Sequence, residues 1–229
     1  MSVIPKRQEK HRGVLLLEKL HDQFLSLVLE KLNPGHESSL SLCVSSCRQG
    51  EGASTVSFNM AIALSLKSID RRILLVDGNI RSPILHSWLK IAPEIPGLVD
   101  VLEGKARFEE VLKRDESSVF SFIAAGRKTE NPIVLFDSKA FDNFLAQARA
   151  QFDIIIFDSV DLMTGPETSV LARKLDGLIM VIEAEKTRWE VATYHKQQLA
   201  DAGVCFTGAI LNKKKMFIPR LVYRLLLAD

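Results

Sequence analysis

Cysteine is scarce in this 229-residue sequence, and long apolar segments are missing. The three cysteines, Cys43, Cys47 and Cys205, are too few and too scattered for a disulfide framework or a zinc site. The longest apolar runs have only the length of a β-strand, so no membrane-spanning helix is expected. Residues 1–13 lack the apolar core of a signal peptide. These absences predict a cytoplasmic protein with reduced thiols.

An excess of charge of one sign is also missing. The sequence has 30 basic and 28 acidic residues, which leave a formal net charge of +2. This value is too small to indicate a nucleic-acid-binding surface over the whole chain, so no nucleic-acid partner is expected. Hydrophobic residues make up 47% of the sequence, an ordinary share for a globular protein. The length suits one α/β domain with a large core.

Strand and helix signals alternate along the chain from Leu40 onward. The strand candidates are continuous apolar runs, as expected where helices cover both faces of a sheet. They are Leu40–Val44, Ile73–Val76, Val119–Ala124, Ile154–Phe157, Leu178–Ile182 and Phe206–Leu211. The helix candidates are Thr55–Lys67, Phe108–Arg114, Lys139–Ala150, Pro166–Lys174 and Arg188–Ala202, with short helices and loops over residues 78–107. This order predicts an α/β fold with a doubly wound, mostly parallel sheet and helices on both faces.

The two ends of the chain differ from this alternating pattern. Residues 1–36 read as a basic tail followed by an appended helix over Val14–Leu32, and residues 37–229 as the domain proper. The stretch from Lys213 to Leu227 combines basic and apolar residues at helical spacing. Such a segment suits a membrane surface or a partner groove, and it equally suits docking on its own domain.

A glycine-bearing stretch lies between the first strand candidate and the first helix candidate. A strand, such a turn and a helix N-terminus in this order are the layout of a phosphate-binding loop (P-loop). Its backbone N–H groups point toward bound phosphate, the helix dipole adds positive potential, and a hydroxyl at its end reaches Mg²⁺. The candidate cofactor-binding residues are therefore Cys47, Arg48, Gln49, Gly50, Glu51, Gly52, Ala53, Ser54 and Thr55.

The loop lacks the positive side chain that this motif normally carries. The pattern Gly-x-x-x-x-Gly-Lys-[Ser/Thr] places a lysine beside the β- and γ-phosphates, and that position is Ala53 here, while Cys47 stands at the first glycine. Alanine offers neither charge nor donor, so a contact that is usually among the larger catalytic terms is absent. Arg48 either compensates for the lysine or is a solvated loop residue.

Two carboxylates stand where apolar runs end. Asp77 follows Ile73–Val76, and Asp158 follows Ile154–Phe157. Ligands of open α/β sheets bind at the carboxyl ends of strands. Asp77 and Asp158 are therefore predicted to hold Mg²⁺ or its water beside Ser54, and to be the catalytic residues if the protein is active. The alternative is that each aspartate is a turn or cap residue.

The segment from Ile73 to His86 resembles the Walker A′ region of bacterial tyrosine kinases of the capsule and exopolysaccharide type. That region typically reads Leu-Leu-Ile-Asp-x-Asp-Leu-Arg-x-Pro, with a histidine shortly after it. The resemblance covers residues 38–212 and extends to the wider ParA/MinD class of P-loop ATPases. Further matches in chain order are Pro96-Gly97-Leu98, Asp100-Val101-Leu102, Gly104, Ala125-Gly126, Asn131-Pro132, Phe152-Asp153 with Asp158, Asp176-Gly177, Lys186-Thr187-Arg188, and Gly208 with Leu211-Asn212.

The resemblance implies a set of ligands and partners. ATP or ADP with Mg²⁺ would be the cofactors, and Asn212 would join the nucleotide-binding residues. The partner would be an inner-membrane polysaccharide co-polymerase or chain-length protein, which places the chain peripherally at the inner membrane. Contact with the membrane surface and a homo-oligomer are both left open.

Several positions depart from the pattern of the resembled family. The substitutions are Ala53 for the loop lysine, Asn79 for the second Walker A′ acid, Ser159-Val160 for a Pro-Pro pair, and Leu25 and Val28 for two arginines of an oligomerisation signature. The family's C-terminal tyrosine cluster is missing as well, because Tyr223 is the only tyrosine of the tail. These losses predict a degenerate member with weak or no kinase activity and weak or absent nucleotide binding.

Three hypotheses about function follow. The preferred one is a P-loop protein of exopolysaccharide biosynthesis or export that regulates or scaffolds a membrane partner. The second is an active ATP-dependent tyrosine kinase in which Arg48 replaces the lost lysine. The third is a ParA/MinD-like positioning ATPase whose C-terminal basic segment binds the membrane.

Overall fold

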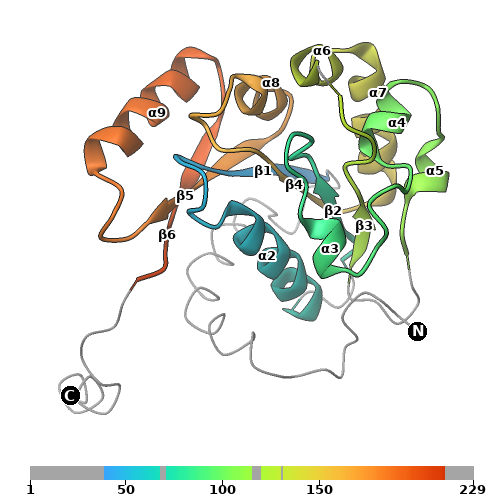
Figure 1. The fold of residues 1–229 in the computed structure, drawn as a ribbon, viewed down its shortest axis with the longest axis horizontal. Helices are drawn as coiled ribbons and strands as arrows, with labels where there is room; N and C mark the ends of the chain where they lie inside the picture. Colours follow the sequence, from blue (N-terminus) through green and yellow to red (C-terminus); the bar gives the residue numbers. More distant parts are fainter. Residues whose placement is uncertain (1–38, 68–70, 115–119, 130, 215–229) are drawn as a thin grey trace.

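The protein folds around one parallel β-sheet (Figure 1). The computed structural model describes residues 39–67, 71–114, 120–129 and 131–214. Its strands are β1 (Leu40–Ser46), β2 (Ile73–Asp77), β3 (Ser121–Ile123), β4 (Ile154–Asp158), β5 (Gly177–Glu183) and β6 (Phe206–Asn212). They pair in parallel in the order β3-β2-β4-β1-β5-β6. The predicted fold class is therefore confirmed.

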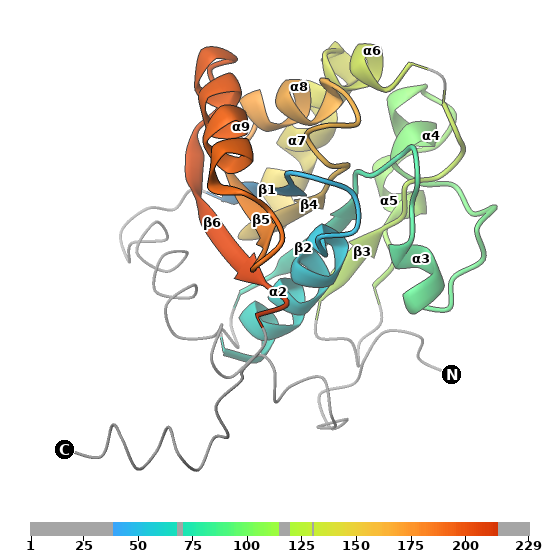
Figure 2. The same ribbon diagram turned by 60° about the vertical axis from the view of Figure 1, so that its left-hand side comes forward.

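Helices cover both faces of the sheet, because side chains along each strand alternate between the two faces. On β2, Leu75 joins the core under α2, whereas Leu74 and Val76 join the core on the other face. The views in Figures 1 and 2 agree that α2 and α3 lie on one face and that α6 to α9 lie on the other. The helices are α2 (Ala53–Lys67), α3 (Leu85–Trp88), α4 (Leu98–Leu102), α5 (Phe108–Val111), α6 (Pro132–Phe136), α7 (Lys139–Gln151), α8 (Glu167–Arg173) and α9 (Trp189–Asp201).

The strand order creates a crevice at the carboxyl end of the sheet. The chain leaves β1 for β2 and β3, returns to place β4 beside β1, and then continues on the opposite side of β1 with β5. The loops after β1, β2 and β4 consequently converge at one edge of the sheet. Open α/β sheets bind their ligands at such a point, where the strand order reverses.

The structure differs from the sequence predictions at two helices. The helix expected over Phe108–Arg114 ends at Val111, because Lys113 leaves the helical path and pairs with Phe122 through backbone hydrogen bonds of 2.8 and 3.0 Å. The short helix α6 was not predicted. Its five residues are too few to show a helical period.

The terminal segments give no test of the corresponding predictions. The expected helix over Val14–Leu32 and the stretch from residue 215 to 229 lie outside the described residues. No helix in the described part of the chain is long and apolar enough to cross a membrane.

Candidate functional site

The P-loop connects β1 to α2 and has the backbone of a phosphate-binding turn. Gly50 and Gly52 adopt positive φ angles of +83° and +101°, which other residues rarely adopt. A side chain at Gly52 is excluded a second time, because an ideal Cβ there would lie 2.3 Å from Asn212 Nδ2. The shape of the loop therefore favours glycine at both positions, and the contact with Asn212 at the end of β6 adds a second reason at Gly52.

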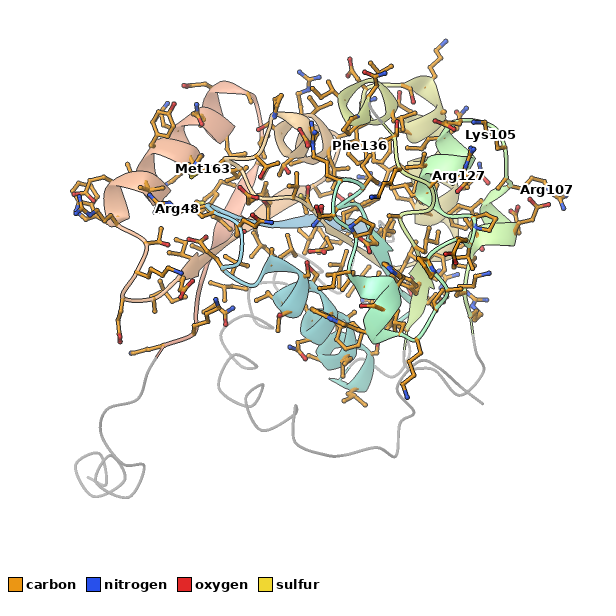
Figure 3. The ribbon with its side chains drawn as sticks, in the orientation of Figure 1. Arg48, Lys105, Arg107, Arg127, Phe136 and Met163 are labelled. Carbon is orange, nitrogen blue, oxygen red and sulfur yellow. The ribbon has the colours of Figure 1, made fainter. Side chains whose placement is uncertain are left out.

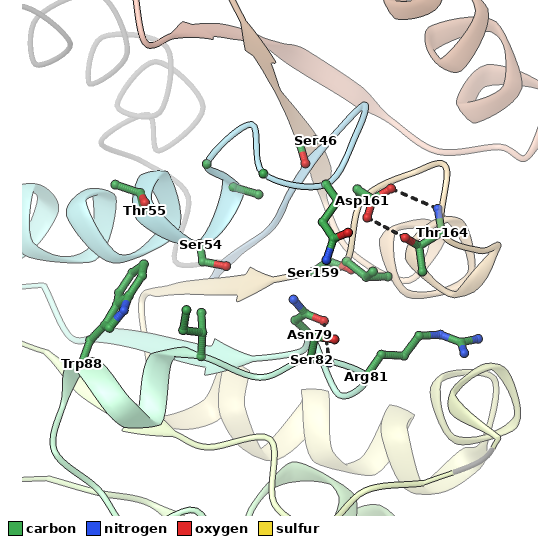
Figure 4. Close-up of a pocket in the computed structure, with 16 residues that line it drawn as sticks. Ser46, Ser54, Thr55, Asn79, Arg81, Ser82, Trp88, Ser159, Asp161 and Thr164 are labelled. Carbon is green, nitrogen blue, oxygen red and sulfur yellow. Dashed lines mark hydrogen bonds between the residues drawn. The ribbon is translucent and has the colours of Figure 1, made fainter.

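A cavity of about 580 Å³ lies in front of the loop. Three segments line it: P-loop residues from Gln49 to Thr55, the segment from Asn79 to Trp88 after β2, and the segment from Ser159 to Thr164 after β4. Figure 4 shows Ser54, Asn79 and Ser159 around the same cavity. The structure thus brings together three stretches that the sequence had indicated separately.

Asp77 and Asp158 lie side by side at the carboxyl ends of β2 and β4, and neither is among the residues that line the cavity. They occupy paired positions on β2 and β4, and both side chains are fully buried. Asp77 Oδ2 accepts the Leu85 N–H at 3.3 Å, and Asp158 Oδ1 lies 2.8 Å from Ser57 Oγ. Ser54 also hydrogen-bonds to Asp158. Asp77 Oδ1 and Asp158 Oδ2 have no hydrogen-bond partner among the described residues.

Burial raises the pKa of both aspartates. The pKa of Asp158 rises to about 6, although hydrogen bonds from Ser54 and Ser57 lower it in part. The pKa of Asp77 rises well above its usual value, first through burial and then through the neighbouring charge of Asp158. Two carboxylates this close disfavour ionisation of both, so the pair retains a proton at mildly acidic pH.

The two orphaned carboxylate oxygens fit a divalent cation. Mg²⁺ binds oxygen ligands and is usually held by one or two carboxylates together with water and substrate phosphates. Asp77, Asp158 and the Ser54 hydroxyl supply such a set. Asn79 adds no charge, and its Oδ1 already accepts the Ser82 N–H at 3.2 Å. In the part of the chain that the structure describes, no group of three or more His, Cys, Asp or Glu side chains that could hold a metal ion occurs.

Several P-loop side chains face away from the cavity. Cys47 is buried, with its Sγ 3.3 Å from Met180 Sδ, and burial raises the pKa of this thiol to about 12. Glu51 is also buried, and its carboxylate accepts hydrogen bonds from the Arg48 N–H at 3.1 Å and from the Thr187 hydroxyl. These two side chains therefore anchor the loop, and phosphate would be bound by the backbone N–H groups of the loop.

Arg48 does not take the place of the missing lysine in this structure. Its side chain is exposed and does not line the cavity, and Figure 3 shows Arg48 at the outer end of the loop. Arg81 is the one cation among the described residues that line the cavity. Its Nε donates to the buried carboxylate of Glu167, and Figure 4 shows its side chain directed away from Ser54.

Comparison with known proteins identifies the family. Tyrosine-protein kinase CpsD of Streptococcus pneumoniae serotype 4 is 30% identical over 172 residues, a span that covers 75% of each chain. The chain belongs to the family of bacterial tyrosine-protein kinases. The VpsO kinase domain, a solved structure, is 26% identical with a TM-score of 0.75, and the match covers 90% of this chain and 100% of that domain. No family model matches the sequence.

A more distant neighbour shares the fold of this kinase-family chain. MinD of Pyrococcus horikoshii, solved in complex with Mg-ADP, superposes with a TM-score of 0.63 over 82% of this chain and 77% of its own. Its 20% identity supports a common fold and nothing more specific. The resemblance to tyrosine kinases is thereby confirmed, and the likeness to the MinD class is confirmed at the level of the fold.

Three contacts of the kinase-family site were not predicted from the sequence. Ser57 binds Asp158, and its position one turn after Ser54 on the same helix face was an available signal. Thr187 binds Glu51 and Lys213 binds the P-loop, although 136 and 163 residues separate the partners. No local pattern could have connected residues that lie so far apart in the chain.

Proposed function

We propose that this kinase-family chain binds nucleotide weakly and transfers little or no phosphoryl group. It serves exopolysaccharide biosynthesis or export by regulating or scaffolding a membrane chain-length or export partner. The observation that carries the proposal is Ala53 at the first position of α2, inside a P-loop whose glycines and backbone are otherwise intact. The exopolysaccharide role rests on the resemblance of the segment from Ile73 to His86 to kinases of that type.

Different groups of the site would bind the phosphates and the metal ion. Backbone N–H groups of the loop and the N-terminus of α2 would hold the phosphates. Ser54, Asp77 and Asp158 would hold Mg²⁺, which neutralises phosphate charge when bound. At position 53 no cation meets the β- and γ-phosphates. The surface cations Lys105, Arg107 and Arg127 lie around α4 and α5 and are paired with carboxylates (Figure 3).

We expect no tyrosine autophosphorylation. Purified protein incubated with Mg-ATP should show no phosphotyrosine by mass spectrometry, because Ala53 and Asn79 each remove a charged group from the donor site. An Asp158→Asn variant prepared in parallel reveals any contaminating kinase, whose signal would be equal in both samples. Phosphotyrosine that appears in the wild type and disappears in Asp158→Asn would overturn the proposal.

Membrane association is proposed to depend on the C-terminal segment. Removal of residues 215–229 leaves Lys213 and its contacts in place and removes most of the apolar and basic residues of the tail. The truncated protein should move from the membrane fraction to the soluble fraction and keep its cooperative thermal transition. Loss of that transition would show that the segment belongs to the domain core. Membrane binding that switches with ATP would instead favour a positioning ATPase.

A further inference from the structure

Two consecutive residues at the end of β6 hold the backbone of the P-loop from outside. Asn212 Nδ2 donates to the Glu51 carbonyl oxygen at 2.8 Å, and Lys213 Nζ donates to the Gly50 carbonyl oxygen at 2.6 Å. Figure 2 shows the end of β6 beside the start of α2, where the loop enters the helix. We call Asn212 and Lys213 the β6 clamp.

The clamp contacts the carbonyl ends of two P-loop peptide groups, opposite their N–H ends. The carbonyl of Glu51 shares its peptide group with the Gly52 N–H. The carbonyl of Gly50 shares its group with the Glu51 N–H, which donates to the Arg48 carbonyl oxygen at 3.4 Å within the loop. A donor on a carbonyl polarises the peptide group and strengthens the N–H on its other end as a donor. Lys213 thus holds the Gly50 peptide group in the turn that the Glu51 N–H closes, and Asn212 fixes the direction of the Gly52 N–H before any ligand arrives, which lowers the entropy cost of binding.

The base of the clamp is rigid. Asn212 pairs with Glu183 across β5 and β6, and the Ala184 N–H donates to the Asn212 carbonyl oxygen at 2.9 Å. Lys213 has a positive φ of +58°, an uncommon conformation for a residue with a side chain. The sheet edge therefore directs the Lys213 side chain back toward the loop in a conformation that an unconstrained chain would seldom adopt.

Glu183 holds the ammonium group of Lys213 in place. Its Oε2 lies 3.2 Å from Lys213 Nζ and 3.1 Å from Lys186 Nζ. The two lysines, Lys186 first, lower the pKa of the Glu183 carboxyl, which therefore stays ionised at neutral pH. One carboxylate faces two ammonium groups, so the net charge of this trio is positive at the edge of the P-loop.

We propose that Lys213 is a positioning residue for the P-loop. It orients the Gly50–Gly52 backbone for phosphate and supplies, from outside the loop, positive potential where Ala53 supplies none. The affinity part of this proposal rests on the proposed nucleotide binding. The orientation part does not, because it concerns the free protein.

The alternative is that Lys213 is only a surface ion-pair partner of Glu183. The Lys213 side chain is 45% exposed, and exposed ion pairs contribute little. In that case the contact with the Gly50 carbonyl would be incidental. Removal of Lys213 and removal of a neighbouring lysine would then affect the loop alike.

The test compares single substitutions in the full chain. Lys213→Gly removes the clamp side chain and tolerates the positive φ, so the backbone is relaxed rather than strained. Lys214→Ala is the matched control, because it removes one positive charge from the adjacent exposed residue, for which no contact with the loop is seen in the structure. Lys213→Arg restores a cationic donor at the clamp. Each protein is examined by amide hydrogen exchange and by titration with fluorescently labelled Mg-ADP.

For Lys213→Gly without nucleotide, we expect exchange in peptides covering residues 49–53 to accelerate about 5–20-fold, the scale of one lost hydrogen bond. Its affinity for Mg-ADP should fall by about the same factor, while its melting temperature should not fall. Lys213→Arg should lie close to the wild type in both measurements, and Lys214→Ala should be unchanged.

Equal exchange in Lys213→Gly and Lys214→Ala would overturn the proposal, whether or not nucleotide binds. Faster exchange in a protein that binds no Mg-ADP would support the orienting role and refute the proposed nucleotide binding. Faster exchange with unchanged affinity would refute the affinity role of Lys213 alone.

Discussion

Ala53→Lys is expected to tighten ATP binding roughly 10–100-fold. The restored ammonium would donate to the β- and γ-phosphates, and a hydrogen bond to a charged group contributes about 1.5–3 kcal/mol. Ala53 lines the cavity in front of the P-loop, so a longer side chain at this position has space to extend toward a ligand. A cation at the N-terminus of α2 opposes the helix dipole, which costs about 0.3–1 kcal/mol in the free protein.

Ala53→Met is the control for this substitution, because methionine adds comparable length without charge. It should leave the affinity for ATP within about twofold of the wild type, while Ala53→Lys shows the full gain in a titration with labelled ATP and Mg²⁺. Unchanged affinity in Ala53→Lys would mean that another cation already serves the phosphates. Arg48→Ala would then weaken binding by the wild-type loop, which we do not expect from the outward position of Arg48.

Asp77→Asn is expected to stabilise the protein at neutral pH. Asp77 Oδ1 and Asp158 Oδ2 are buried without partners, and an unsatisfied buried polar group costs about 1–3 kcal/mol. An asparagine amide keeps an acceptor for the Leu85 N–H and gives the pair a donor that ionised carboxylates lack. A gain of about 1–2 kcal/mol corresponds to a rise of roughly 2–8 °C in melting temperature for a domain of this size.

The expected change of stability with pH follows from the direction of the two pKa shifts. Both aspartates have pKa values in the folded protein above their unfolded values, so the folded state binds more protons. Stability that comes from the protonated pair is present at low pH and is lost as the pH rises from about 4 through about 6. The contribution of this pair to wild-type stability should therefore fall over this range, and Asp77→Asn should reduce the fall. Thermal unfolding at pH 4.5, 6 and 7.5 measures both effects.

Asp161→Asn is a suitable comparison for Asp77→Asn. Asp161 is also buried after β4, but both of its oxygens are occupied, by the Thr164 N–H at 3.0 Å and the Thr164 hydroxyl at 2.6 Å. Its replacement should lower the melting temperature at neutral pH. If Asp77→Asn lowered it equally, the aspartate pair would contribute to folding and would not be a stability cost retained for Mg²⁺.

The individual elements follow closely from local sequence. The apolar runs predicted every strand of the described sheet. Strands β1 to β5 are covered on both faces and bury most of their residues, whereas the edge strand β6 is apolar but only partly buried. The P-loop could also be predicted from the sequence, since a strand, its glycines and the following helix are neighbours along the chain. Asp77 and Asp158 could be placed at strand ends for the same reason. The errors were local as well, as at α5, where pairing of Lys113 with Phe122 overrode helical propensity.

Local sequence was therefore enough to predict the strands, most of the helices, the P-loop without its lysine, and the positions of the two aspartates at strand ends. The fold, in contrast, places Asp77 and Asp158 side by side in a buried position and turns Arg81 to Glu167. It also decided that Lys213, expected in a membrane-facing tail, binds the P-loop. These contacts depend on how β2, β4, β5 and β6 are ordered in the sheet. That order is set by packing between distant segments, which leaves no local signal in the chain.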